Sequence, residues 1–249
     1  MNLLLLEPGA VNNGRAVLRD HQARHVLTVL RAAPGDTLRV GLRDGPRGTA
    51  CVQRLGDDEV ELTCTLEDHL PPRPPVDLLL ALPRPKVLKR LWAQLAALGV
   101  DRIMLTNAAR VERNYFDTHV LEPDFYTHLL IEGLQQAQDT RLPRVTIHRQ
   151  FKPLVEDELD QLSDTTRRLL ADPAGTDLPA GAPEERILLA VGPEGGWVDF
   201  ERELLGRHRF QPFSLGPRTL RTDTACLALL AVVTHGPHKT PTCNLQPET

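Results

Sequence analysis

Residues 187–196 of this chain are Ile187-Leu188-Leu189-Ala190-Val191-Gly192-Pro193-Glu194-Gly195-Gly196. Five apolar residues in a row are typical of a strand that is covered on both faces of a parallel sheet. The glycines and the proline that follow end such a strand in a tight turn. In α/β proteins, ligands bind at the carboxyl ends of parallel strands. The stretch therefore predicts an α/β fold with a binding loop at residues 191–196, although the glycines taken alone favour a simple turn. The sequence of residues 187–196 matches neither the P-loop motif nor the dinucleotide-binding fingerprint.

A second polar stretch lies downstream and reads Leu215-Gly216-Pro217-Arg218-Thr219-Leu220-Arg221-Thr222-Asp223-Thr224-Ala225. A strand at residues 211–215 is predicted to end in this loop. The apolar run 225–233 then predicts a helix with Thr222 as its cap. Two arginines and three threonines in one loop suggest that it holds a ligand. The alternative is that Arg218 and Arg221 are surface charges and that the threonines only cap the helix.

Strands and helices alternate on the amino-terminal side of these loops. Residues 76–82 form another run that is apolar apart from Asp77, and Pro85 is suited to the first turn of a helix that Gly99 ends. The further predicted elements are strands at 103–105, 145–148 and 169–170 and helices at 122–138 and 154–162. This alternation predicts an α/β domain with a mainly parallel sheet.

The clearest boundary in the chain is Pro71-Pro72-Arg73-Pro74-Pro75. Four prolines in five residues favour neither a helix nor a central strand. We interpret residues 71–75 as a stiff linker. It separates a small domain at residues 1–70 from a larger domain at residues 76–237, and a loose polar tail follows at residues 238–249.

The amino-terminal part carries short strand patterns at residues 38–42, 49–55 and 60–64. Turn signals lie beside them at residues 34–36, 45–48 and 57–58. This spacing is typical of a small β-barrel. A short helix is predicted after Asp20, which is placed as its cap. The apolar residues expected on this helix are Val26, Leu27, Val29 and Leu30.

The net charge of −4 argues against a nucleic-acid-binding protein if it is taken alone. The charge is uneven, however, because residues 1–50 hold seven arginines against four acids and residues 84–113 hold seven basic residues against two acids. Residues 51–70 hold one arginine against six acids. The basic stretches can bind phosphate, and the alternative is that all three are solvated faces. With only six Phe, two Trp and two Tyr, base stacking on an aromatic platform is unlikely to dominate.

Composition also disfavours several classes of protein. The apolar run 78–82 is far shorter than the roughly 20 residues that cross a bilayer. The leucines at the start of the chain lack the basic region of a signal peptide. None of the four cysteines forms a CxxC pair, so neither a zinc site nor a disulfide framework is expected. We expect a cytoplasmic protein without a metal.

Together, GPEGG and the later LGxRxLRTxTA resemble the signature of SPOUT methyltransferases. In particular, the chain is similar to RsmE-type enzymes, which methylate N3 of a uridine in small-subunit (16S) ribosomal RNA. Residues 25–36 are similar to the HxxxVLR…GD stretch of that family's PUA-like barrel, and residues 98–103 to its ELGV segment. Two positions depart from the family. Residues 135–143 lack a glutamate and an arginine of EQxGRxxxP, and Asp223 stands where LRTETA has glutamate.

The resemblance implies a parallel sheet with a trefoil knot near the carboxyl end, a homodimer, and S-adenosylmethionine as cofactor. Three loops would hold the cofactor, after residues 170, 191 and 215. The residues assigned to it are Leu170, Val191, Gly192, Pro193, Glu194, Gly195, Gly196, Leu215, Gly216, Leu220, Arg221, Thr222 and Thr224.

The implied reaction needs negative charge on uracil to be stabilised, because N3 is a poor nucleophile while it is protonated. A fixed guanidinium has this effect, and the candidates are Arg221 first and Arg218 second. Asp223 or Glu194 would accept the proton or orient an arginine, and we favour orientation. Ribosomal RNA is the implied partner, and the candidate RNA-binding residues are Arg24, His25, Arg31, Arg84, Lys86, Lys89 and Arg113.

Two other functions stay open from the sequence. One is a SPOUT enzyme that methylates another base or a ribose hydroxyl of RNA. The other is an RNA-binding protein that has kept the fold and lost the enzymatic activity.

Overall fold

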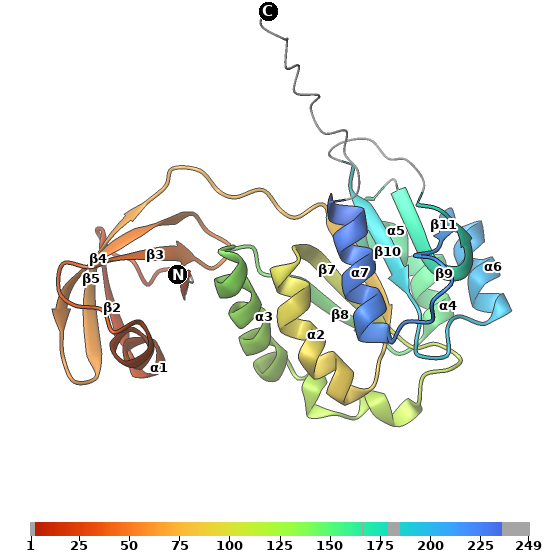
Figure 1. The fold of residues 1–249 in the computed structure, drawn as a ribbon, viewed down its shortest axis with the longest axis horizontal. Helices are drawn as coiled ribbons and strands as arrows, with labels where there is room; N and C mark the ends of the chain where they lie inside the picture. Colours follow the sequence, from red (N-terminus) through yellow and green to blue (C-terminus); the bar gives the residue numbers. More distant parts are fainter. Residues whose placement is uncertain (1–2, 166, 179–184, 236–249) are drawn as a thin grey trace, which may run out of the picture. The chain divides into compact units, whose positions relative to one another are not determined.

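The structure is a computed structural model that describes residues 3–165, 167–178 and 185–235. Its contacts divide the described chain into two compact units (Figure 1). Unit 1 consists of residues up to 74, 84–103 and 113–146, and unit 2 consists of residues 75–83, 104–112 and those from 147 onward. Each unit is described separately below. The predicted tail at residues 238–249 lies outside the described residues.

Unit 1 contains a five-stranded sheet with the order β1-β3-β4-β5-β2. Its strands are β1 (Leu4–Leu6), β2 (Arg15–Arg19), β3 (Thr37–Leu42), β4 (Arg47–Leu55) and β5 (Glu59–Leu66). Strands β2, β4 and β5 alternate between buried and exposed residues, as a sheet with one covered face requires. The covered face builds a core that includes Leu18, Val40, Val52 and Leu62. The strand patterns predicted for residues 38–42, 49–55 and 60–64 are confirmed.

The short helix after β2 differs from the prediction. It consists of α1 (Asp20–Arg24) and a π-helix, η1 (His25–Leu30). The cap position falls on Arg19, because β2 runs directly into the helix, and Asp20 is its first residue. Val26 is fully buried, but Val29 is 65% exposed. The predicted Asp20 cap is therefore wrong. The wide π turn breaks the regular helical spacing, so the four apolar residues of the segment do not share one buried face.

Two longer helices, α2 (Pro85–Ala97) and α3 (Pro123–Ala137), pack against each other in unit 1. Proline stands in the first turn of each helix, where its missing N–H costs nothing. Gly99, with a φ of +75°, follows the end of α2. Trp92 is buried and its Nε1 donates to the carbonyl oxygen of Val120 at 3.2 Å. Two short 3₁₀ helices lie between α2 and α3, namely η2 (Arg113–Phe116) and η3 (His119–Leu121).

Residues 138–141, after α3, bind the five-stranded sheet of unit 1. Arg47 lies 3.3 Å from the carboxylate of Asp139. Thr140 is fully buried, and its hydroxyl donates to the carbonyl oxygen of Gly45 at 2.7 Å. The backbone oxygen of Thr140 accepts from the Asp44 N–H at 2.7 Å. This segment, which departs from the family pattern, thus joins α3 to the turn between β3 and β4.

Replacing Thr140 with valine should lower the free energy of unfolding by about 1–2 kcal/mol. Valine keeps the shape of threonine but removes the hydroxyl, which leaves the partly buried Gly45 carbonyl without this donor. Urea denaturation measures the change. The matched control is Thr63→Val at an exposed position of β5, where the same change should have little effect. Equal stability of the Thr140 variant and the wild type would contradict this role.

The second sheet has six strands in the order β11-β9-β10-β6-β7-β8. Its strands are β6 (Val76–Ala81), β7 (Val100–Thr106), β8 (Arg144–His148), β9 (Arg167–Thr176), β10 (Ile187–Val191) and β11 (Phe210–Phe213). The pairs β6–β10, β9–β10 and β9–β11 are parallel. Every residue of β6 and β10 is buried, in agreement with sequences that are apolar at every position except Asp77. The prediction of an α/β fold with a parallel sheet is confirmed.

The helices of unit 2 follow the predicted order with different ends. Residues 151–162 form a helical segment of α4 (Phe151–Pro153), the π-helix η4 (Leu154–Glu158) and α5 (Leu159–Leu162). After β10 comes α6 (Asp199–Arg207), and the last described helix is α7 (Thr222–His235). The N–H of Ala225 donates to the carbonyl oxygen of Arg221 at 2.7 Å. Arg221 therefore occupies the cap position and Thr222 the first helical position, so the predicted Thr222 cap is wrong.

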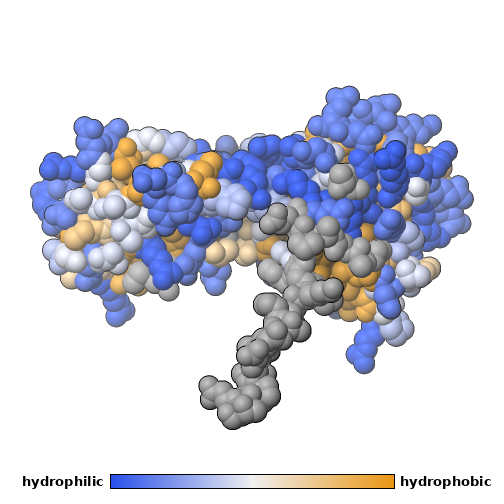
Figure 2. Space-filling view, turned by 90° about the horizontal axis from the view of Figure 1, so that it is seen from above, coloured by the Kyte–Doolittle hydropathy of each residue, from blue (hydrophilic) through white to orange (hydrophobic). Residues whose placement is uncertain are grey.

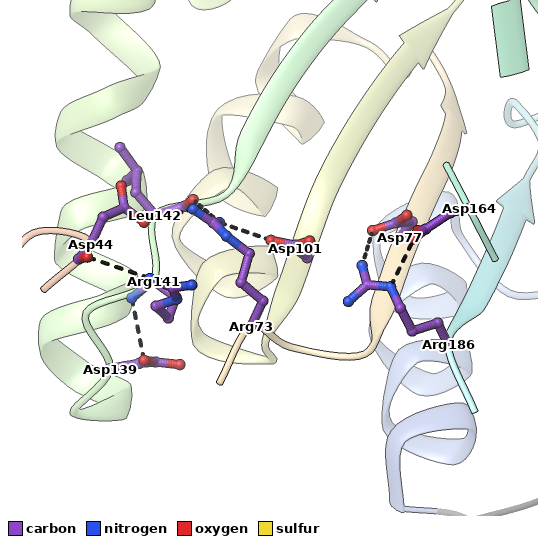
Figure 3. Close-up of polar contacts among 9 residues, drawn as sticks. All are labelled: Asp44, Arg73, Asp77, Asp101, Asp139, Arg141, Leu142, Asp164 and Arg186. Carbon is purple, nitrogen blue, oxygen red and sulfur yellow. Dashed lines mark hydrogen bonds and ion pairs between the residues drawn. The ribbon is translucent and has the colours of Figure 1, made fainter. Parts of the chain in front are cut away.

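Two buried carboxylates, those of Asp77 and Asp101, each bind an arginine (Figure 3). In unit 1, the Arg73 guanidinium lies 2.8 Å from Asp101 and 2.9 Å from Asp44. In unit 2, Asp77 at the start of β6 is fully buried and accepts from the Ser163 hydroxyl at 2.8 Å and from Arg186 at 3.1 Å. Both carboxylates thus have charged partners, as buried charges require.

The surface in the space-filling view is largely hydrophilic, with patches of apolar residues between the polar ones (Figure 2). Among the described residues, no helix is both long and apolar enough to span a membrane. Part of the acidic stretch forms ion pairs on the solvent side of the β4–β5 hairpin, where Arg54 contacts Glu59 and Glu61. That part of the chain is a solvated face.

Candidate functional site

A bulge in β9 forms the first wall of the candidate site. In the pairing with β11, the register passes from Leu170 to Thr176 in one step, so residues 171–175 lie outside the paired ladder. Proline at 173 has no N–H to offer to a neighbouring strand. Gly175 is required here, because a Cβ at this position would lie 2.5 Å from the Phe213 backbone nitrogen. The bulge turns Asp172, Pro173 and Ala174 toward a cleft.

The cleft has a volume of about 450 Å³ and lies where β9, β10 and β11 end. This size is within the range of small-molecule sites. Its lining residues are Arg110, Ala171, Asp172, Pro173, Ala174, Val191, Gly192, Pro193, Glu194, Gly195, Gly196, Trp197, Arg202, Phe213, Ser214, Leu215, Gly216, Arg218, Thr219, Leu220, Thr222, Ala225 and Leu229. All belong to unit 2, and they meet at the sheet edge where parallel α/β proteins bind ligands.

The β10 loop (residues 192–197) packs tightly on a tryptophan. Trp197 is buried, and its ring lies 5.4 Å from the ring of Phe151, centroid to centroid. A Cβ on Gly192 would lie 3.1 Å from Cδ1 and Nε1 of Trp197. Glycine at 192 therefore lets the backbone of the loop lie against the indole and keeps the space above it open.

The opposite wall presents apolar side chains to the cleft. Leu215 and Leu220 are each 39% exposed, which is unusual for leucines in a concave site. Between them, Gly216 adopts a φ of +105°, a backbone conformation that side chains disfavour. The Ser214 hydroxyl accepts from the Gly216 N–H at 3.1 Å and fixes this turn. The wall is thus shaped for an apolar or flat group.

The charged side chains of the cleft fall into two groups. Arg202 is held in place, because it lies 3.6 Å from Asp172 and also contacts Asp199. Asp172 in turn accepts from the Ala174 N–H at 2.9 Å. By contrast, Arg110 and Arg218 have no carboxylate partner among the described residues. Both are exposed, so their charges are available to a ligand.

A buried glutamate connects two loops of the site. Glu201, in the first turn of α6, is only 3% exposed. Its Oε1 accepts from the Ala109 N–H at 2.7 Å, and its Oε2 accepts from the Val198 N–H at 2.9 Å. The β7 loop (residues 107–112) and the β10 loop are therefore joined through one carboxylate.

The structure brings most of the sequence-predicted residues to the cleft. Those that line it are Val191, Gly192, Pro193, Glu194, Gly195, Gly196, Leu215, Gly216, Arg218, Leu220 and Thr222. The remaining four, which are not among its lining residues, are Leu170, Arg221, Asp223 and Thr224. Leu170 is buried where β9 still pairs with β10, and the bulge that follows lines the cleft in its place. Arg221 caps α7, and the Asp223 carboxylate accepts from the Thr224 N–H at 3.0 Å.

Sequence reasoning missed several lining residues, most notably Asp172, Arg110 and Trp197. The run Asp172-Pro173-Ala174-Gly175 carries turn signals directly after an apolar strand and was a usable sign of the bulge. Trp197 follows the glycines immediately. Arg110 carried no local signal, because its place in the cleft depends on the arrangement of β7.

The predicted RNA-binding residues all belong to unit 1, and none lines the cleft. Arg24, Arg31 and Arg113 are exposed, whereas His25 is half-buried. Arg84, which immediately precedes α2, and Lys86 and Lys89 on α2 are exposed. Lys89 lies 5.6 Å from the centre of the Phe125 ring. Among the described residues, no group of three or more His, Cys, Asp or Glu side chains is placed to hold a metal ion.

Comparison with known proteins places this geometry in a family. Residues 71–234 match a family model described as an RNA methyltransferase domain, and residues 18–63 match an RNA methyltransferase PUA domain. The ribosomal RNA small subunit methyltransferase E of Treponema pallidum is 32% identical over 245 residues, covering 96% of this chain and 92% of that protein. The ribosomal RNA small subunit methyltransferase E 1 of Borreliella burgdorferi is 25% identical over 228 residues. This match covers 92% of this chain and 95% of that protein.

Solved structures have the same fold. The ribosomal RNA small subunit methyltransferase E from Neisseria gonorrhoeae, bound to S-adenosyl methionine, matches with a TM-score of 0.76 at 23% identity and covers 94% of this chain and 96% of that one. A probable rRNA-methyltransferase from Porphyromonas gingivalis matches with a TM-score of 0.75 at 22% identity, covering 94% and 97%. With the RNA methyltransferase domain matched across most of its length and a PUA-like domain before it, the chain belongs to the RsmE-type family of RNA methyltransferases.

Proposed function

We propose that this protein transfers a methyl group from S-adenosylmethionine to small-subunit (16S) ribosomal RNA. The observation that carries the proposal is the cleft at the ends of β9, β10 and β11. It combines two glycine-containing loops, exposed leucines and two guanidinium groups that have no carboxylate partner among the described residues. The names of the relatives, which are small-subunit ribosomal RNA methyltransferases, support the RNA substrate.

The residues present fit this cofactor. Leu215 and Leu220 offer exposed apolar surface to a flat adenine ring, and Gly192 and Gly216 line the same cleft. Backbone N–H groups of the β10 loop are suited to polar atoms of the cofactor. When bound, S-adenosylmethionine supplies an electrophilic methyl group. The absence of a metal cluster among the described residues plays no part in this proposal.

Replacing Gly192 with alanine should raise the Kd for S-adenosylmethionine about tenfold. The added Cβ would press on Trp197 at 3.1 Å, and displacing a packed indole or loop costs about 1–3 kcal/mol. Isothermal calorimetry measures the Kd. The matched control is Gly206→Ala in α6, where a Cβ would meet nothing within 4 Å and affinity should stay unchanged. Equal affinity of the Gly192 variant and the wild type would exclude this contact from the cofactor site.

We further propose N3 of a uridine as the methylated atom. N3 is a poor nucleophile while it is protonated, so it would lose its proton to Glu194 or to water before it accepts the methyl group. Until the methyl group is transferred, negative charge lies on the ring and its carbonyl oxygens. A guanidinium in the cleft stabilises this charge. Arg218 is in position for this role, whereas Arg221 caps α7 and supports the loop from outside the cleft. Of the two candidate carboxylates, Glu194 lines the cleft and Asp223 does not.

The domain boundaries of the proposal are residues 1–70 for a PUA-like barrel that recognises RNA, 71–75 for the linker and 76–237 for the methyltransferase domain. The basic residues of unit 1 would bind RNA phosphates. A trefoil knot, a homodimer and a cytoplasmic location belong to the same proposal. The half-buried apolar residues Leu227, Ala231 and Val232 of α7 support a second copy as its partner.

The test is analysis of modified nucleosides in small-subunit ribosomal RNA from a strain that lacks the gene, followed by treatment of that RNA with the pure protein and S-adenosylmethionine. Loss of 3-methyluridine in the strain and its restoration by the protein support the proposal. Loss of another methylated base or of a 2′-O-methyl nucleoside would redirect the activity to that target. Unchanged nucleosides together with no cofactor binding would leave a non-enzymatic RNA-binding protein.

A further inference from the structure

Arg110 is the one described residue of the cleft that does not belong to residues 171–229. It lies in the β7 loop, and no sequence motif assigned it a role. The backbone around it is held on both sides. The Asn107 N–H donates to the His148 carbonyl oxygen at 3.1 Å, the Val111 N–H donates to the Ala108 carbonyl oxygen at 3.0 Å, and Glu201 holds the Ala109 N–H. An exposed arginine on so constrained a backbone is held at a defined place.

The side chain of Arg110 lies across the β10 loop. Its Nη1 donates to the carbonyl oxygen of Gly195. A Cβ on Gly195 would lie 2.7 Å from Cδ of Arg110, so glycine at 195 leaves the space that the aliphatic part of the arginine fills. Gly195, the second glycine of the GPEGG motif, is therefore needed for the contact with Arg110 as well as for the turn.

The guanidinium of Arg110 retains donors for a ligand. Arginine has five N–H donors, and one contact to a carbonyl leaves the others unused among the described residues. Arg110 has no carboxylate partner there, unlike Arg202, which contacts Asp172 and Asp199. Two guanidinium groups without such a partner, those of Arg110 and Arg218, thus line one cleft from two separate loops.

We propose that Arg110, positioned by Glu201, binds an anionic group of the RNA nucleotide that enters the cleft and forms a two-arginine site with Arg218. This inference rests on the proposed function. RNA is preferred to the cofactor as the ligand, because S-adenosylmethionine carries a net positive charge and two unpaired arginines would repel it. A nucleotide supplies a phosphate, and a uracil that loses its N3 proton supplies charged oxygens; both suit a guanidinium.

The experiment compares Arg110→Ala, Arg110→Lys and Glu201→Gln with the wild type. Methyl transfer to unmodified small-subunit RNA gives kcat and KM, and calorimetry gives the Kd for S-adenosylmethionine. We expect Arg110→Ala to lower kcat/KM for RNA about 100-fold and to change the cofactor Kd less than threefold. Arg110→Lys should recover part of the loss, because it restores the charge without the planar donors. Glu201→Gln should lower kcat/KM by a smaller factor, because it removes the charge that holds the β7 loop but keeps an acceptor oxygen.

Whether Arg110→Ala changes kcat or KM distinguishes the two candidate anionic groups, a phosphate and a deprotonated uracil. A loss confined to KM, with a flatter dependence on salt, identifies a phosphate, and a loss confined to kcat identifies the charged uracil. The matched control is Arg207→Ala, an exposed arginine of α6 outside the cleft, which should keep full activity. Full activity of Arg110→Ala, or a loss explained entirely by weaker cofactor binding, overturns the inference. A wild-type protein that transfers no methyl group would instead overturn the proposed function.

Discussion

Replacing Arg218 with alanine should lower kcat for methyl transfer to small-subunit RNA by about 100- to 1,000-fold. This is the usual loss when one donor that stabilises a developing anion is removed. Arg218 lines the cleft and is exposed to it without a carboxylate partner among the described residues. Its positive charge is therefore not neutralised by a described carboxylate and can act on a ligand in the cleft. Steady-state kinetics with tritiated cofactor measure the effect, and calorimetry should show a cofactor Kd within about fivefold of the wild type.

Arg221→Ala is the informative companion to this variant. The same LGxRxLRTxTA motif contains both arginines, but Arg221 occupies the cap position of α7 and does not line the cleft. Its removal should lower kcat by about tenfold or less, through a less ordered loop. If Arg221→Ala instead abolishes transfer while Arg218→Ala stays active, the roles of the two residues are the reverse of those proposed here.

Replacing Asp77 with alanine should lower the free energy of unfolding by about 3 kcal/mol, the lower end of the range for breaking a buried ion pair. Asp77 is fully buried and accepts hydrogen bonds from Ser163 and Arg186. Without it, the Ser163 hydroxyl keeps a contact to Thr165 at 2.9 Å, and Arg186 keeps its contact to Asp164 at 3.7 Å. The cost is at the lower end because Arg186 is 30% exposed and water can solvate it.

Two variants isolate the buried charge in this prediction. Asp77→Asn keeps the size of the side chain and an acceptor oxygen, so its loss of stability should be smaller than that of Asp77→Ala. Asp164→Ala removes the other carboxylate near Arg186, whose side chain is 85% exposed, and should cost less than about 1 kcal/mol. Denaturation in urea ranks the three variants. If Asp164→Ala were as destabilising as Asp77→Ala, the buried hydrogen bonds would not explain the effect.

The sequence was most informative where a local pattern decides the local structure. The apolar runs of β6 and β10 predicted these strands, because burial on both faces of a sheet requires apolar residues. The proline in the first turn of α2 predicted the start of that helix, because its fixed φ suits this position. The capping position of α7 was wrong by one residue. Threonine and arginine stand next to each other there, and the chain path into the helix, rather than the preference of the side chain, decided which one is the cap.

The rest of the site depended on contacts between segments far apart in the chain. Arg110 meets Gly195 across 85 residues, and Ala109 meets Glu201 across 92. No window of the sequence contains both partners of either contact. The π turn at residues 25–30 was missed for another reason, since its residues differ from those of an ordinary α-helix in hydrogen bonding and not in composition.

The contact between Thr140 and Gly45 has a consequence for biosynthesis. It joins residues that are 95 positions apart, and the backbone of Leu3 also donates to the carbonyl oxygen of Gln135 at 3.0 Å. Chains generally fold from the amino terminus as they leave the ribosome. The turn between β3 and β4 is nevertheless completed only after α3 has been translated. Until more than half of the chain has been translated, the Leu3 N–H and the Gly45 carbonyl of the nascent amino-terminal sheet therefore lack these partners and stay hydrated.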